Sequence, residues 1–136
     1  MRDLVTGFVP AAALALGVLI PGAAQATGSV SCTDLKADSG VDILLGAGPV
    51  PNLLRVSIAL GERQLTTEPG LPGERVTVAQ AYDDGELWRI DLVDDQATKR
   101  VAIIRLLRAD HDSLPLQLGF VQLEGEPPVG LSCVGP

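Results

Sequence analysis

Aromatic side chains and histidine are scarce in this sequence. The 136 residues include one Trp, one Tyr and two Phe, and His111 is the only histidine. Ligand clefts are lined largely by apolar and aromatic side chains, so a sugar cleft of the glycosidase type is poorly supplied. A single imidazole cannot form a histidine metal cluster, and the nearby Ser113 lacks the glycine elbow of a hydrolase nucleophile. The sequence therefore predicts no catalytic residue and no cofactor.

Lysine is also rare. Lys36 and Lys99 are the only lysines among ten basic residues, and the formal net charge is −7. Nucleic acids and anionic membranes bind clustered basic side chains, so we expect this acidic chain to bind neither. The preference for arginine is typical of GC-rich genomes and favours a bacterial source.

Cysteine occurs only twice, at Cys32 and Cys133. In an exported chain an even pair predicts a disulfide, here between the first and last strands. Closing a loop of about 100 residues could stabilise the fold by about 4–5 kcal/mol in the chain-entropy model. Two separate buried thiols are the alternative. The spacing excludes CxxC redox chemistry, and two thiols alone do not form a zinc site.

The N-terminal segment has the features of a signal peptide. Arg2 precedes an apolar stretch over residues 4–20, and residues 24–26 have the small-x-small form of a signal-peptidase site. The alternative is an uncleaved membrane anchor, although the stretch is on the short side for a span. We predict a signal peptide over residues 1–26 and a single exported β domain over residues 27–136, secreted or periplasmic and without stable membrane insertion.

The rest of the chain is organised around residues 87–108, where two apolar, β-branched runs flank a polar turn. This pattern is typical of a β-hairpin. Turn residues recur along the chain, and no amphipathic helix is evident. The sequence predicts an all-β fold: a small antiparallel β-sandwich or barrel of about 7–9 strands, with a C-terminal meander and terminal strands joined by the disulfide. Strands outside the meander are expected over residues 29–37, 41–45, 53–60 and 129–134.

Cross-strand pairing predicts the register of the meander. One register of the central hairpin produces two apolar and two opposite-charge pairs, whereas a one-residue slip would set apolar residues against charges. The predicted pairs are Ile90–Val101, Trp88–Ile103, Asp91–Arg100 and Glu86–Arg105, with Val78–Ile90, Val76–Leu92, Leu107–Leu116 and Ile103–Phe120 on the flanking strands. The predicted core face comprises Val76, Val78, Trp88, Ile90, Leu92, Val101, Ile103, Leu107, Leu116, Leu118 and Phe120.

The opposite face of the third meander strand is also apolar, which is unusual for a sheet face exposed to solvent. Such a face must be covered by other strands or a partner, or it must be a binding surface. The candidate interaction surface comprises Ala102, Ile104 and Leu106, with Leu87, Val121 and Leu123 nearby.

Two acidic turns are expected at the same end of the sheet, because two strands separate them. Four carboxylates at one end could bind Ca²⁺ through oxygen ligands, although their spacing does not match an EF-hand. We expect these residues to be solvated turn acids. The weak calcium candidates are Asp83, Asp84, Asp110 and Asp112.

The leading functional hypothesis is a non-enzymatic exported β domain that binds a protein partner or self-associates. It follows from the missing catalytic residues and the two-sided apolar strand. One alternative is a barrel that carries a small apolar ligand in its interior. A hydrolase that uses the acidic turns is the third and least favoured hypothesis.

Overall fold

The computed structural model describes residues 26–48, 51–111 and 114–135, which form nine β-strands and no helix. None of these residues therefore belongs to a helix that could cross a membrane. Most of the predicted signal peptide lies outside the described residues. The strands are β1 (Ala26–Thr33), β2 (Ser39–Gly46), β3 (Leu53–Leu60), β4 (Arg63–Thr66), β5 (Glu74–Asp83), β6 (Leu87–Asp94), β7 (Arg100–His111), β8 (Leu114–Leu123) and β9 (Val129–Val134).

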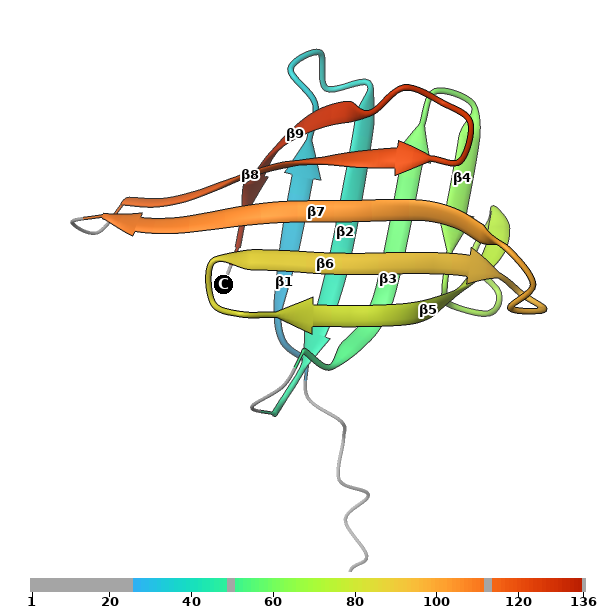
Figure 1. Ribbon diagram of the computed structural model, residues 1–136, viewed down its shortest axis with the longest axis horizontal. Coiled ribbons are helices and arrows are strands. Elements are labelled where there is room, and N and C mark those ends of the chain that lie inside the picture. The colour runs from blue at the N-terminus through green and yellow to red at the C-terminus, as the bar shows by residue number, and fades with distance from the viewer. Residues whose placement is uncertain (1–25, 49–50, 112–113, 136) are drawn as a thin grey trace, which may run out of the picture.

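The nine strands form a closed barrel in which each strand pairs with its neighbours in sequence and β9 pairs with β1. In Figure 1, β1 to β4 run upright at the back, and β5 to β8 cross in front of them. The predicted all-β fold is confirmed, and it is a barrel rather than a sandwich. The expected antiparallel pairing fails at one place, because β4 and β5 are parallel at Leu65–Glu74 and Thr66–Arg75. The barrel is therefore mixed.

Strand β4 has no counterpart in the sequence prediction. It is only four residues long and follows Gly61, which has a positive φ of 57°. Such a short segment carries too little alternation to be recognised. In the barrel its Leu65 is buried, and Arg63 forms ion pairs with Glu74 and Glu126, both at 2.9 Å.

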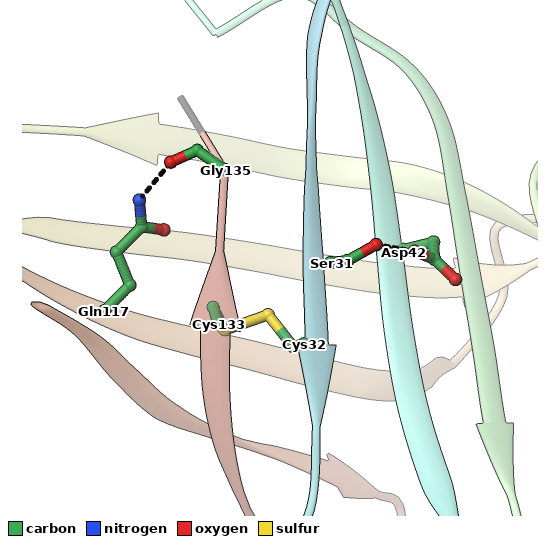
Figure 2. Close-up of a disulfide and its surroundings, with 6 residues drawn as sticks. All are labelled: Ser31, Cys32, Asp42, Gln117, Cys133 and Gly135. Atoms are coloured by element: carbon green, nitrogen blue, oxygen red, sulfur yellow. Dashed lines mark hydrogen bonds between the residues drawn. A yellow bond between two sulfur atoms is a disulfide. The ribbon is translucent and has the colours of Figure 1, made fainter. Parts of the chain in front are cut away.

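The predicted disulfide is confirmed. Cys32 and Cys133 lie directly opposite one another on β1 and β9, 101 residues apart in sequence. Figure 2 shows the bond crossing between these two strands. The β1–β9 pairing consists of only three residue pairs, so the disulfide reinforces the shortest antiparallel seam of the barrel. A disulfide also indicates an oxidising, non-cytoplasmic location.

The barrel interior is filled by side chains that alternate inward along every strand. Aliphatic residues dominate, and both cysteines and Trp88 belong to the same cluster. The largest fully buried side chains are Ile43, Leu65, Ile90, Leu92, Ile104, Leu106, Leu123, Val30, Val41, Val56, Val76 and Val121.

The predicted register between β6 and β7 is wrong by three residues. Ile90 pairs with Ile104 instead of Val101, and Trp88 pairs with Leu106. The hairpin turn is longer than expected, because the Asp94 amide donates to the Lys99 carbonyl across four residues. A bulge follows where Leu92 and Val93 pair with Ala102 and Arg100. The longer turn accounts for two residues of the shift and the bulge accounts for the third.

An odd shift reverses the two faces of β7, because successive side chains point to opposite sides of a strand. The surface predicted from Ala102, Ile104 and Leu106 is therefore the barrel core, and each of these residues is at most 1% exposed. On β8, which pairs with β7, Val121 and Leu123 are buried as well. The last member of the predicted surface, Leu87, is half-buried.

The same reversal turns part of the predicted core face outward. Leu107, Leu116 and Leu118 are exposed, and Ile103 and Phe120 are half-buried. Leu107 pairs with Leu118 and Ile103 with Gln122, each two residues from the predicted partner. The remaining members, Val76, Trp88, Ile90, Leu92 and Val101, are buried as predicted, and Val78 packs partly buried against them.

Charged pairs across the meander also differ from the prediction. Arg105 forms its ion pair with Asp91 at 2.7 Å rather than with Glu86, and Arg100 lies 3.5 Å from Glu124 rather than against Asp91. In the shifted register Arg105 lies opposite Arg89, so Asp91 is a diagonal neighbour.

The β5–β6 pairing is shifted in the same direction. Val78 pairs with Leu92 and Val76 with Asp94, and a bulge lies between Val78 and Gln80. The turn is closed by the Asp84 amide, which donates to the Leu87 carbonyl at 3.4 Å. The predicted pairs Val78–Ile90 and Val76–Leu92 are therefore absent.

Candidate interaction surface

Three leucines are exposed side by side on the outside of β7 and β8. Leu107 lies directly opposite Leu118, and Leu116 is on the same face of β8. Their exposed fractions are 56% for Leu107, 43% for Leu118 and 54% for Leu116. Single exposed leucines are common, but neighbouring ones form a contiguous apolar patch. We call Leu107, Leu116 and Leu118 the leucine face.

The row next to the leucine face combines aromatic residues and arginines. Tyr82 pairs with Arg89, Arg89 with Arg105, and Arg105 with Phe120. Arg105 is held in place, because it forms an ion pair with Asp91 at 2.7 Å and also donates to two main-chain carbonyls. Arg89 is exposed, and its charge interacts with the Asp84 carboxylate on the β5–β6 turn.

A groove of about 510 Å³ adjoins the leucine face on its other side. Leu118 forms one wall, and the β1–β2 loop, with the fully exposed Leu35, forms the other. The floor lies over β9 at Gly130 and Ser132. A Cβ atom at Gly130 would have no neighbour within 4 Å, so the missing side chain leaves the floor open. The groove is mainly apolar.

Polar side chains stand at the rim of this groove. Asp34 and Lys36 are on the β1–β2 loop, where the Asp34 carboxylate accepts hydrogen bonds from the amides of Asp38 and Ser39. These bonds hold the loop in shape. The carboxylate of Asp38 is exposed and forms no ion pair within the described residues.

A second polar cluster consists of Arg108 and Asp83, which lie beside the buried Trp88. Arg108 forms an ion pair with both carboxylate oxygens of Asp83 at 2.5 Å, and its guanidinium lies 4.8 Å from the Trp88 ring centroid. The Trp88 Nε1 is buried without a hydrogen bond of good geometry, but it approaches the Asp83 carboxylate. This arrangement accounts for the charge of Arg108 without a ligand.

The pKa of Asp83 reflects these contacts. Burial acts to raise the pKa, but the Trp88 N–H, the Gly85 amide and the Arg108 guanidinium outweigh it. The pKa is therefore held below the ordinary value of 3.8.

On β8, the Gln117 side-chain amide donates to the Gly135 carbonyl at 3.0 Å and so links this strand to the residue that follows β9 (Figure 2).

In the part of the chain that the structure describes, only Asp83 and Asp84 of the four calcium candidates have described side chains. No three His, Cys, Asp or Glu residues come together there in a way that could hold a metal ion. The oxygens of Asp83 bind Arg108, and one oxygen of Asp84 accepts hydrogen bonds from two turn amides. Asp112 and the side chain of Asp110 lie outside the described residues.

No protein-family model matches the chain, and no curated protein or solved structure is significantly similar to it. Its function must therefore be inferred from its own surface. Sequence reasoning identified β7 as apolar on both faces but assigned the outer face to the core. The groove was missed because its walls come from β8 and the β1–β2 loop, and no local pattern brings these segments together.

Proposed function

We propose that this protein is a non-enzymatic, exported β-barrel that binds another protein chain through the leucine face and the adjoining groove. The observation that carries the proposal is the exposure of Leu107, Leu116 and Leu118 on neighbouring strands. Large contiguous apolar patches are uncommon on monomeric proteins and mark interaction sites.

The surroundings of the leucine face support a protein partner. Protein interfaces are enriched in Tyr, Phe and Arg, and their apolar centre is bordered by polar side chains. Tyr82, Arg89, Arg105 and Phe120 form the adjacent row, and Lys36 lies at the groove rim. The leucine face lies on the sheet surface of β7 and β8 rather than at a strand edge, so a partner would bind it through side chains rather than by strand addition.

The interior offers less support for a ligand carrier. Aliphatic side chains from the barrel strands pack together there in one cluster. The groove outside the barrel is the better-shaped space for an apolar group, and it adjoins exposed leucines. Binding at the surface is therefore favoured over transport in the interior.

Export is part of the proposal. The disulfide requires an oxidising compartment, and the apolar segment at residues 4–20 with its small-x-small site fits a cleaved signal peptide. The mature protein would be secreted or periplasmic. Mass spectrometry of the purified protein should give the mass of a chain that begins at Thr27. The mass of a chain with an intact N-terminus would contradict cleavage.

Site-specific photo-crosslinking in cells that produce the protein tests the binding surface. A photoreactive amino acid replaces Leu118, which is 43% exposed, and in a control it replaces Leu54, which is 42% exposed on β3. We expect a discrete protein adduct from position 118 and none from position 54. The Gly130→Val substitution should suppress the adduct, because its side chain fills the groove without a clash. Equal crosslinking at both positions would contradict the proposal.

A further inference from the structure

We infer that β5 binds an extended segment of another protein, which joins the barrel as an added strand along the edge of β5 that faces away from β6. This site is on a different strand from the leucine face, so the inference does not rest on the function proposed above. Three properties of β5 support it: an edge that is largely unpaired, a core that is incompletely covered beside this edge, and a composition without the residues that usually block strand addition.

One edge of β5 is paired over only a small part of its length. On that side, β4 pairs with only the first two residues of β5. The chain then turns toward β3, where the Thr67 amide donates to the Val56 carbonyl at 3.0 Å. Among the described residues, no strand pairs with the rest of this edge, and β5 is the lowest of the crossing strands in Figure 1. We call the unpaired edge over residues 76–83 the β5 edge.

The hydrogen bonds of β6 show which main-chain groups point to the β5 edge. On the β7 side, the Arg108 amide donates to the carbonyl of Glu86, just before β6, at 2.7 Å. Near the other end of β6, the Asp94 amide donates to the Lys99 carbonyl at 3.0 Å. Main-chain groups of a strand point alternately to its two neighbours, so the even-numbered residues of β6 face β7 and the odd-numbered ones face β5. The β5 residues that pair with even-numbered residues of β6 and lie beyond β4 therefore turn their main chains to the open side: Val78, Ala81 and Asp83.

The inward side chains of β5 are fully buried only where β4 lies beside them. Val76, next to the pairing with β4, is 1% exposed. Val78 and Ala81, further along the strand, are half-buried. Their partners on β6, Leu92 and Ile90, are buried, so the same layer of the core is covered on one side and open on the other. A strand in line with β4 would cover the open side.

The β5 edge lacks the side chains by which natural proteins protect an open strand. Such edges usually have lysine, proline or an unpaired inward charge. Residues 76–82 include no charged residue and no proline, and the carboxylate of Asp83 is paired with Arg108. A bulge at Ala79 bends the edge locally and separates Val78 from Ala81. An extended main chain, which has free N–H and C=O groups of its own, is the chemical complement of this edge.

The side chains along the β5 edge define the composition of the partner segment. Its inward side chains would lie beside Val78 and Ala81, where small apolar residues fit. Its outward side chains would lie beside Gln80 and Tyr82, which is 50% exposed, where β-branched or aromatic residues fit. The partner segment is therefore extended, uncharged and free of proline.

Peptide selection followed by hydrogen exchange tests the inference. Random peptides displayed on phage are selected on the purified protein, and we expect uncharged sequences that alternate in the manner of a strand. A selected peptide should slow exchange of the main-chain amides of Val78, Ala81 and Asp83. The amides of Gln80 and Tyr82 face β6 and should exchange slowly with or without peptide. Failure to select any peptide, or protection without this alternation, overturns the inference.

A matched pair of lysine variants locates the binding. Ala81→Lys places a charge on the inward side of the β5 edge and should abolish peptide binding. Ala59→Lys makes the same change on β3, between β2 and β4, and should leave binding unchanged. Circular dichroism shows whether the variants fold. Should Ala81→Lys not fold, Ala81→Pro replaces it, because proline is tolerated where the N–H faces solvent and it removes one donor of the edge. Equal binding by the edge variant and Ala59→Lys contradicts the inference.

Self-pairing of the β5 edge has a different signature. Were a second copy of this chain the occupant, the amides of Val78 and Ala81 would become protected as the concentration of the protein alone is raised. That result would overturn the assignment of the edge to another protein, whereas rapid exchange of these amides at every concentration supports it.

Discussion

Removal of the disulfide should destabilise the barrel mainly through the unfolded state. Cys32 and Cys133 are 101 residues apart, so the bond closes most of the described chain into one loop. For a loop of this length the chain-entropy model assigns about 4.7 kcal/mol at 25 °C. Measured losses for native disulfides in small secreted domains are about 2–5 kcal/mol, and we expect a value in that range for the double variant Cys32→Ala/Cys133→Ala.

Removing the disulfide should also lower the stability of the folded state, because both cysteines are buried in the core. The double substitution removes two buried sulfur atoms from the core, and each small cavity costs about 1 kcal/mol. The three residue pairs that join β1 to β9 would then hold the barrel closed without covalent support. A domain of this size has a free energy of unfolding of about 5–15 kcal/mol. The variant should therefore still fold at low temperature, but with a much smaller free energy of unfolding.

Urea denaturation distinguishes the two contributions. If the bond acts on the unfolded chain, its removal lowers the free energy of unfolding and also raises the m-value, because the unlinked chain exposes more surface. A purely local packing defect would lower the free energy at constant m. A loss below about 1 kcal/mol with an unchanged m-value would refute the role assigned to the disulfide here.

Three further predictions follow from the register, the close strand contacts and the half-buried carboxylate of Asp83. Ile104→Ala should cost about 2–5 kcal/mol in urea denaturation and Ile103→Ala less than about 1 kcal/mol, whereas the reverse order would contradict the observed face of β7. Gly119→Ala should lower the melting temperature strongly, because its Cβ would overlap a main-chain oxygen of β7, whereas Gly130→Ala should be nearly neutral. The lowered pKa of Asp83 stabilises the fold above its unfolded value of about 3.8, and this contribution is lost as the pH falls through the lower folded pKa. Asp83→Asn should therefore flatten the acid limb of the stability–pH curve, and an unchanged slope would exclude this contribution.

Local patterns in the sequence were sufficient for the fold class. Alternating β-branched runs and frequent turn residues predict short strands and no helix, and an even pair of cysteines in a chain expected to be exported predicts the terminal disulfide. These features depend on neighbouring residues or on simple counting, so they can be read without knowledge of the tertiary structure. The inward positions of β6, from Trp88 to Leu92, were correct for the same reason.

The candidate interaction surface depended on the strand register, which the local pattern does not contain. Both faces of β7 are apolar, so either Ile103 or Ile104 could have faced the core. The longer Asp94–Lys99 turn and the bulge beside it decided between them, and together they shift the pairing by an odd number of residues. Only the closed barrel therefore shows that Ile104 belongs to the interior and that Leu107 and Leu118 are exposed outside. The sequence by itself determined that this chain forms a disulfide-linked β domain, whereas the tertiary register decided which leucines are exposed on the outside of the barrel.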